Sequence, residues 1–440
     1  MRSAPLNAIV AAALVLMPAI PRIPVVGATA VESHSTAIER LQTLQQSLKQ
    51  AHAANNADDY LRSAVTMHDF LNGSPNSVLQ LMLAQIFAGK EDDAARSFKQ
   101  FVHMGQSNEE LMRSKQFDAL RALRQYPLLH AEMVANSKSK SLASKAFGLS
   151  DGELLLPEDI DFDARTQHFY ITSVLKKEIV AVDMKGNSHI FASGPDKWPM
   201  MAVKVDATRR LLWATEVALD GFPWSPSEDW GRSMILLYDL KTGKLLWRVE
   251  GPAHRALGDM TLTAAGDAIL SDGDRGGVYR VRRETQQIER LDAGDFISPQ
   301  TPTMLPGDGR VLVPDYVRGI AILNLKTKQV SWISMDGRYA LSGIDGIYLS
   351  GHTIIATQNG TSPERVVRFE VDQSFLQAKS ETIIERSTPT LGDPTHGVVV
   401  NGRFYYIANS GWDAFDEHGK PKAGTAMSEP LIMSVTLNTQ

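Results

Sequence analysis

The sequence predicts a mainly β protein in which a six-bladed β-propeller follows a small α-helical domain. After about residue 155 a pattern of three strands recurs six times, and its third strand is the clearest part. These third-strand segments are residues 178–183, 234–243, 277–281, 319–328, 365–372 and 431–437. Self-similarity at roughly 40 to 55 residues with strand-type alternation is typical of sheets arranged radially around an axis. Between about residues 36 and 135 the apolar positions follow a helical period instead.

Length and composition agree with two domains and exclude several kinds of chemistry. The 440 residues exceed one ordinary domain, so a propeller of roughly 300 residues leaves about 100 for a second unit. The net charge is -5, and positive and negative residues are mixed along the chain, so no basic region for binding a polyanion is predicted. We therefore expect no nucleic-acid partner. The chain has no cysteine, so any metal must bind oxygen or imidazole ligands, and disulfides are excluded.

Residues 1–30 have the pattern of a secretory signal peptide. Arg2 precedes an apolar run from Ala8 to Ile20, and residues 28–30 read Ala-Thr-Ala, a small-x-small cleavage site. The run is shorter than the about 20 apolar residues of a membrane span, and no later stretch approaches that length. We therefore expect an exported protein, periplasmic or secreted, with no membrane span in the mature chain. A retained N-terminal anchor is the alternative.

Residues 31–136 are expected to form the helical domain, because apolar residues recur there at helical spacing. Gly73 and Pro75 break the chain between two helices, and residues 78–104 resemble a tetratricopeptide repeat. One interpretation is a groove for a peptide or protein partner. The other is a set of helices that covers a propeller edge. The second is favoured, because stable repeat arrays need three or more units and this segment offers two at most.

Two further boundaries follow from composition. Residues 137–152 are rich in serine and lysine, and we expect a solvated linker there. Residues 153–440 then form the propeller. No His-Glu-x-x-His, Gly-x-Ser-x-Gly or phosphate-binding glycine-rich motif occurs in the chain.

The geometry of a blade indicates which residues reach the propeller axis. The first strand of each blade starts at one mouth of the axis, and the second strand returns to that mouth. The residues that start the first strands are Glu158, Met201, Gly258, Thr301, Asp345 and His396. The residues that end the second strands are Ser173, Glu216, Asp272, Asp315, Asn359 and Asn409. We expect both sets near one mouth, where Met201, Thr301 and the last four of the second set are candidate ligand contacts.

Two carboxylates and an imidazole are thus expected to converge at the axis. Glu158, Asp345 and His396 would repel one another or shift their pKa values unless a neighbour neutralised them, and a divalent cation commonly does so. The alternative is that the two acids cap strand starts or hold waters, and that His396 is a hydrogen-bonded structural residue.

Three segments resemble the senescence marker protein/gluconolactonase propellers and, more distantly, the paraoxonases. They are residues 156–163 (LPEDIDFD), 258–263 (GDMTLT) and 344–349 (IDGIYL). The resemblance implies an axial divalent metal, usually Ca²⁺ or Zn²⁺, that polarises a lactone or ester carbonyl. The metal-binding Glu of that family corresponds to Glu158, and its axial Asp corresponds to Asp345, the candidate catalytic acid or base.

The chain also departs from that family at the axis. Gly258 and Thr301 stand where the family has asparagines, so two neutral oxygen ligands are missing. Asp259 keeps half of the family's Asn-Asp pair. Either Asp259, His396 and the acids at the ends of the second strands rebuild the coordination, or the metal site has been lost.

Two long loops are expected to overhang the same mouth. Residues 217–232 carry Trp224 and Trp230, and residues 410–429 carry Trp412. These aromatic side chains form either a lid over a bound ligand or a packing layer on the blades.

The leading functional hypothesis is an exported gluconolactonase-like propeller. It would bind a small ligand at its axial mouth and hydrolyse a lactone or ester with the help of a divalent cation, Ca²⁺ or Zn²⁺. The alternative is a non-catalytic binding scaffold that uses the surfaces of the propeller and the helical repeats, since a fold by itself does not fix an activity.

Overall fold

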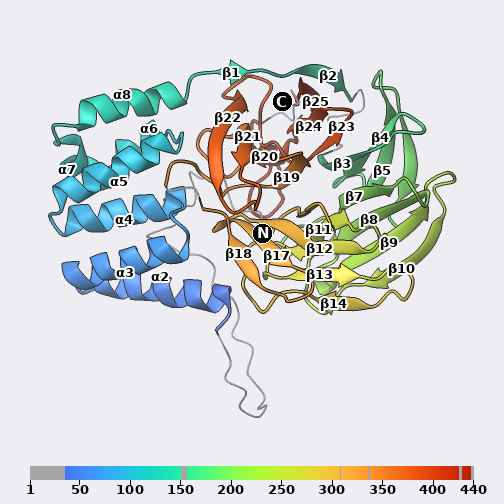
Figure 1. Ribbon diagram of the computed structural model, residues 1–440, viewed down its shortest axis with the longest axis horizontal. Helices are drawn as coiled ribbons and strands as arrows, with labels where there is room; N and C mark the ends of the chain where they lie inside the picture. Colours follow the sequence, from blue (N-terminus) through green and yellow to red (C-terminus); the bar gives the residue numbers. More distant parts are fainter. Residues whose placement is uncertain (1–34, 150–155, 308, 335–336, 426–428, 438–440) are drawn as a thin grey trace, which may run out of the picture.

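The computed structural model describes residues 35–149, 156–307, 309–334, 337–425 and 429–437. These residues form six antiparallel sheets that are arranged as the blades of a propeller, with a helical region at one side, as the sequence predicted. Figure 1 shows both parts. The predicted signal peptide, residues 1–30, lies outside the described residues.

The first three blades follow one another along the chain. Blade 1 contains β3 (Pro157–Asp163), β4 (His168–Ser173), β5 (Glu178–Asp183) and β6 (Ser188–Ser193). Blade 2 contains β7 (Met200–Asp206), β8 (Leu211–Val217), β9 (Ser233–Asp239) and β10 (Leu245–Glu250). Blade 3 contains β11 (Leu257–Leu262), β12 (Ala268–Asp272), β13 (Val278–Val281) and β14 (Ile288–Arg290). Between these sheets lie buried aliphatic and aromatic side chains, which form the core.

Blade 4 continues this pattern, whereas blades 5 and 6 each include a strand from earlier in the chain. Blade 4 contains β15 (Thr303–Met304), β16 (Arg310–Asp315), β17 (Gly319–Asn324) and β18 (Val330–Trp332). Blade 5 contains β19 (Gly346–Ser350), β20 (Thr353–Gln358), β21 (Arg365–Val371), β22 (Ala378–Arg386) and the early strand β1 (Lys140–Ser141). Blade 6 contains β23 (Gly397–Val400), β24 (Arg403–Asn409), β25 (Leu431–Thr436) and the early strand β2 (Ser144–Gly148).

The ring is closed by the segment that was expected to be a linker. Within residues 137–152, β1 extends blade 5 and β2 is the outer strand of blade 6, so this segment is part of the sheets (Figure 1). Phe147 of β2 is 6% exposed, and its ring centroid lies 5.3 Å from that of Phe169 in blade 1. One buried phenylalanine anchors a strand whose Ser144 and Lys145 face solvent. The serines and lysines that suggested a linker belong to that exposed face.

The helical region contains several short antiparallel helices. They are α2 (Ala37–Ala53), α3 (Ala57–Phe70), α4 (Pro75–Phe87), α5 (Glu91–His103), α6 (Glu109–Met112), η1 (Lys115–Phe117), α7 (Asp118–Arg121) and α8 (Tyr126–Asn136). Thr36 and Glu39 form a capping box at the start of α2, and Pro75 begins α4 after the predicted break. In the described residues no helix combines the length and apolar character needed to cross a membrane.

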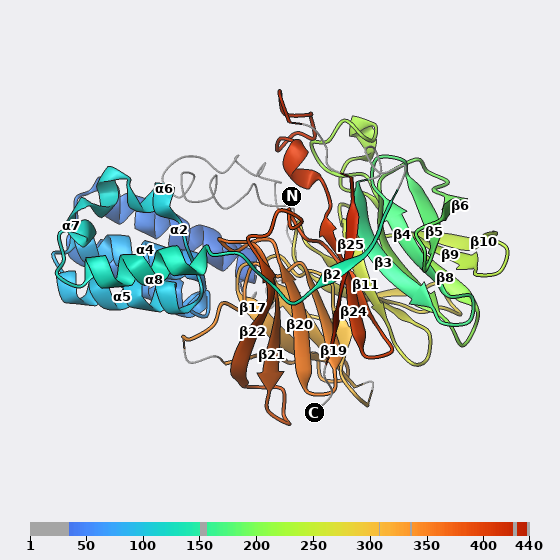
Figure 2. The same cartoon turned by 90° about the horizontal axis from the view of Figure 1, so that it is seen from above.

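The helices pack against blades 4 and 5, as Figure 2 shows from above. Phe98 and Met133 of the helices share one buried cluster with Ile320 of blade 4 and Phe369 of blade 5. This arrangement matches the interpretation in which the helices cover a propeller edge. A groove for a peptide partner stays a prediction.

Arg318, in the loop between β16 and β17, joins the two parts. Its Nε donates to the carbonyl oxygen of Phe70 at 3.1 Å, and its Nη1 donates to the carbonyl oxygen of Asp295 at 2.8 Å. The guanidinium carbon lies 4.5 Å from the ring centroid of Phe70 and 4.2 Å from that of Trp332. Cation–π contacts of this kind hold the end of α3 onto blade 4.

We expect Phe147→Ala to lower the free energy of unfolding by about 3 to 5 kcal/mol, because it opens a cavity under the closing strand. Leu142→Ala is the matched control. It lies in the same segment and is 55% exposed, so its effect should stay within about 0.5 kcal/mol. Urea unfolding of both variants checks this expectation. Equal effects would show that β2 does not contribute to closure.

Candidate functional site

Glu158, Asp345 and His396 meet at the axis of the propeller. Each offers a ligand atom, and these atoms all lie within 4.8 Å of one another. The three residues are 1%, 1% and 0% exposed. Glu158 lies near the start of β3, whereas Asp345 and His396 directly precede β19 and β23. The predicted convergence of these three residues is therefore confirmed, and it involves blades 1, 5 and 6.

The residue that follows Asp345 must be small for this convergence to occur. A Cβ atom on Gly346 would lie 2.4 Å from the hydroxyl oxygen of Tyr348 and 3.1 Å from Cδ2 of His396. That hydroxyl accepts the backbone N–H of Gly397 at 2.6 Å, next to His396. Burial raises the pKa of Tyr348 well above its usual value, so the hydroxyl stays protonated. Tyr348 therefore fixes the start of β23, next to His396.

The imidazole of His396 contacts polar groups from three other blades. Its Nε2 lies 2.7 Å from Oγ1 of Thr301 and 3.4 Å from Oδ1 of Asp259. Thr301 donates its hydroxyl proton to Asp259 Oδ1 at 3.0 Å. On the opposite side, His396 Nδ1 lies 3.5 Å from Oδ1 of Asp159. Asp259, the fourth expected metal ligand, and Thr301 thus lie beside the imidazole.

Asp159 is the residue of this site that the sequence did not predict. Its Oδ2 accepts the backbone N–H of Val203 at 2.8 Å and the Lys204 ammonium at 2.6 Å. Burial raises the pKa of Asp159, while the charge of Lys204 opposes that rise. Strict alternation would place neighbouring residues on opposite faces, but the register shifts between Pro157 and Ile160. This β-bulge allows Glu158 and Asp159 to reach the same centre.

Neutral donors hold the two carboxylates of the triad. Asn359 Nδ2 donates to Asp345 Oδ2 at 3.2 Å, and the Tyr316 hydroxyl donates to Asn359 Oδ1 at 3.1 Å. Trp412 Nε1 donates to Glu158 Oε2 at 2.7 Å. Asn359 and Trp412, which were expected as ligand contacts, therefore contact the carboxylates of the triad.

Asp272 and Asp315 instead bind groups of the nearby blade loops. Asp272 Oδ2 lies 3.2 Å from Nη1 of Arg255, and Asp315 Oδ2 accepts the backbone N–H of Ile297 at 2.7 Å. Burial raises the pKa of both carboxyls. Asn409 pairs through its backbone with Gly392. The hydrogen bonds of Asp272 and Asp315 and the backbone pairing of Asn409 indicate that these residues stabilise the blades.

The two long loops pack on each other above blades 1, 2 and 6. The ring centroids of Trp224 and Trp412 are 5.5 Å apart, and Met201 lies in the same apolar cluster. Gly419 has a φ of +66°, and a Cβ there would lie 2.3 Å from Phe222 Cδ1, so the loops touch directly. Trp230 donates through Nε1 to the carbonyl oxygen of Phe222 at 3.1 Å. The packing interpretation describes this arrangement, and a lid over a bound ligand stays a prediction.

Gly258 leaves room at the position where gluconolactonase-like propellers have an asparagine. A Cβ atom on Gly258 would meet only the carbonyl oxygen of Ala256, at 3.9 Å. Thr301, at the second such position, contacts Asp259 and His396. Gly258 therefore leaves space at the axis, whereas Thr301 supplies a hydroxyl group.

The geometry of the triad fits a single divalent cation. Ca²⁺ binds oxygen ligands at about 2.3 to 2.6 Å, so two opposite ligands lie about 5 Å apart, and separations within 4.8 Å are compatible. The imidazole is a donor typical of Zn²⁺, whose bonds are shorter, about 2.0 to 2.2 Å. Two buried carboxylates and an imidazole therefore form a donor set that either ion can use after small side-chain movements.

No protein-family model and no curated protein matches the chain. Similar solved structures include a gluconolactonase from Xanthomonas campestris, with 14% identity and a TM-score of 0.43, covering 66% of this chain and 91% of that chain. A calcium-binding regucalcin from Agrobacterium tumefaciens has 15% identity and a TM-score of 0.45, covering 66% of this chain and 92% of that chain. Virginiamycin B lyase from Staphylococcus aureus has 14% identity and a TM-score of 0.45, covering 68% of this chain and all of that chain, 100%.

These similar structures include the gluconolactonase and regucalcin kinds of propeller that the sequence resembles. Their names describe different activities, and a shared fold does not assign one of them to this chain.

We expect Glu216→Gln to be more favourable for stability at pH 8 than at pH 5. Glu216 is the second-last residue of β8 and is buried, and burial raises its pKa to about 7. Because its pKa is higher in the folded than in the unfolded state, the protonated Glu216 side chain contributes to the free energy of unfolding. That contribution is fully present below the unfolded pKa and is lost as the pH rises through about 7. The difference between the two pH values should reach up to about 3 kcal/mol.

Thermal unfolding at both pH values checks this expectation. Exposed Glu228→Gln is the control and should leave the pH dependence unchanged. If Glu216→Gln shifts the melting temperature equally at pH 5 and pH 8, the carboxyl is not protonated in the folded protein.

Proposed function

We propose that Glu158, Asp345 and His396 hold a divalent cation at the propeller axis, and that the protein hydrolyses a small lactone or ester there. The observation that carries this proposal is the convergence of the three buried side chains within 4.8 Å. Buried carboxylates that lie this close favour either protonation or a bound cation. When bound, such a cation would polarise the carbonyl of the substrate.

The other residues of the site would position these ligands. Thr301 restrains the imidazole of His396 through Nε2, at 2.7 Å. Asn359 and Trp412 restrain the carboxylates of Asp345 and Glu158. Ligands that are held by hydrogen bonds of their own bind metals more tightly.

Asp345 is the candidate acid or base of the reaction. Its Oδ2 accepts a hydrogen bond from Asn359, which fixes the plane of the carboxylate. A carboxylate at this position can take a proton from an attacking water and return it to the leaving alkoxide. The balance is that of hydrolysis: water adds to the carbonyl carbon, the acyl C–O bond breaks, and the leaving oxygen gains a proton.

The substrate would enter from the mouth that the aromatic loops cover. Trp412 belongs to that apolar cluster and also contacts Glu158, so the loop of residues 410–425 has to shift before a ligand reaches the axis. Apolar walls with few polar groups are typical of sites for small ring-shaped ligands. This supports a small lactone or ester as the substrate class.

We also propose that the protein is exported, on the basis of the signal-peptide pattern in residues 1–30. An exported protein meets free Ca²⁺ at higher concentrations than a protein of the cytosol does. Sites of moderate affinity, with Kd values of about 10⁻⁴ to 10⁻³ M, are typical of extracellular Ca²⁺ modules.

A second candidate is a non-catalytic binding scaffold. The observation that favours it is the closed aromatic layer, in which Met201, Phe222 and Trp412 are each at most 9% exposed. In that case the outer surfaces of the propeller and helices would bind the partner.

We expect the purified mature chain to bind about one divalent cation, and Glu158→Gln and Asp345→Asn to lose it, because each removes a charged ligand. Asp272→Asn is the matched control. It changes a buried carboxylate that contacts Arg255 and lies outside the triad, so it should keep the ion. Elemental analysis and calorimetric titration with Ca²⁺ and Zn²⁺ measure both occupancy and preference. A folded wild type that binds neither ion overturns the proposed metal site.

We expect the wild type to hydrolyse a panel of lactones and aryl esters, and Asp345→Asn to be slower by about 10²- to 10⁴-fold, the usual contribution of acid–base catalysis. Asp272→Asn should retain activity. A pH-stat assay measures the rate. Metal binding without hydrolysis of any member would favour the scaffold.

A further inference from the structure

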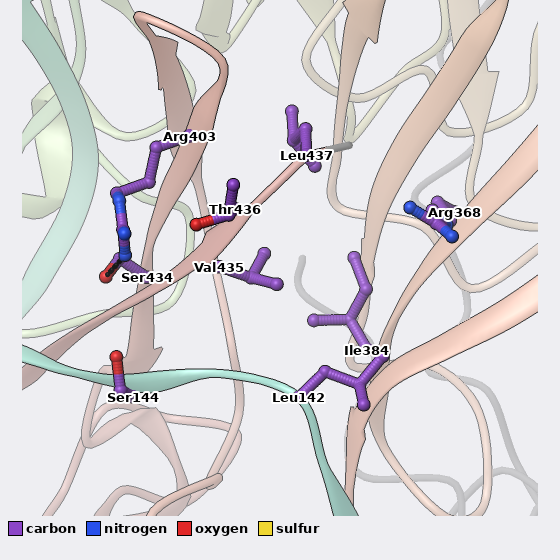
Figure 3. A pocket seen from close by; sticks show the side chains of 9 residues that line it. All are labelled: Leu142, Ser144, Arg368, Ile384, Arg403, Ser434, Val435, Thr436 and Leu437. Atoms are coloured by element: carbon purple, nitrogen blue, oxygen red, sulfur yellow. Dashed lines mark hydrogen bonds between the residues drawn. The ribbon is translucent and has the colours of Figure 1, made fainter. Parts of the chain in front are cut away.

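A cavity of about 360 Å³ lies between blades 5 and 6, away from the axis. Figure 3 shows its lining from close by. Strands β21 and β22 contribute residues from blade 5, and β24 and β25 contribute residues from blade 6. The rest are Leu142, between β1 and β2, Ser144 of β2, and Leu437, directly after β25. The lining residues are Leu142, Ser144, Arg368, Ile384, Arg403, Ser434, Val435, Thr436 and Leu437.

Two arginines face this cavity from different blades. Arg368 of β21 and Arg403 of β24 lie on opposite sides of it in Figure 3, with apolar side chains between them. The lining contains no carboxylate. In the described part of the chain, neither guanidinium forms an ion pair. Two positive charges therefore line one cavity without a paired negative charge among its walls.

The known contacts of these arginines use little of their hydrogen-bonding capacity. Arg403 Nη1 donates to Ser434 Oγ at 3.1 Å. The Nε of Arg368 is buried and has no hydrogen-bond partner among the described residues. A guanidinium has five donors, so most of them are available to a ligand. The Nε of Arg368 is itself buried, so the terminal N–H groups of the two arginines are the donors that could reach a ligand.

Arg280 provides an internal comparison. It occupies the corresponding place in blade 3, in the third strand β13, and its Nε is also buried without a partner in the described residues. Arg280 does not line the cavity. What distinguishes Arg368 is the cavity and the facing Arg403.

We propose that this cavity binds a small molecule with a carboxylate or phosphate group and a short apolar body. Arginine recognises both groups through paired N–H donors, and the hydroxyls of Ser434 and Thr436 can add further donors. Ile384 and Val435 would contact the apolar body. The volume falls within the about 300 to 1,000 Å³ of small-molecule sites. This site is independent of the axial triad and of the reaction proposed there.

Calorimetric titration of the full mature chain with hexanoate, hexyl phosphate and neutral hexanamide tests the proposal. We expect at least one of the two anions to bind, and hexanamide to bind at least about tenfold more weakly. The two anions separate a carboxylate site from a phosphate site. Arg368→Gln should weaken anion binding by about tenfold or more, because it removes the charge and the bidentate donors.

The matched control is Arg280→Gln, which should leave the affinity unchanged. A second variant, Leu142→Trp, fills the entrance from a residue that is 55% exposed, so it should block binding without affecting the fold. If Arg368→Gln does not fold, the Leu142→Trp variant alone tests the proposed anion site. The proposal is overturned if neither anion binds, if hexanamide binds equally well, or if neither Arg368→Gln nor Leu142→Trp weakens binding.

Discussion

Closure of the ring is the constraint on which the axial site depends. Blade 1 begins with β3, and blade 6 is completed by β2, a strand that precedes blade 1 in the chain. Glu158 comes from blade 1, whereas Asp345 and His396 come from blades 5 and 6. These ligands are neighbours only after the first and last blades have met. Pairing of β2 with β25 therefore assembles the site as well as the fold.

The helical region contributes to the same closure from outside the ring. The chain leaves α8 and enters β1, and Arg386 of blade 5 donates to the carbonyl oxygen of Lys138 at 3.1 Å on that path. Docking on blades 4 and 5 thus sets where the closing segment begins. The segment then crosses from blade 5 to blade 6 over the arginine-lined cavity, through Leu142 and Ser144. One short stretch of chain connects the helices, the closure and the proposed anion site.

The sequence predicted the features that repeat from blade to blade. It did not predict the places where a single blade departs from the repeat. Repeating strands predicted six blades and placed Glu158, Asp345 and His396 at the axis. β2 was missed because its exposed face has the composition of a linker and only Phe147 is deeply buried. Asp159 was missed because a β-bulge turns it toward the imidazole of His396. No residue type in this segment predicts that bulge.

The charged groups around the propeller axis bear on the proposed binding of a cation there. Lys204 neutralises Asp159, and His396 lies between Asp159 and Asp259. An indole N–H and an amide N–H orient the carboxylates of Glu158 and Asp345. A cation would bind these carboxylates in their ionised form, so the affinity of the proposed site should fall as the pH is lowered. The closed aromatic layer keeps water from the axis, so a cation bound there would interact with these carboxylates more strongly than it would in open solvent.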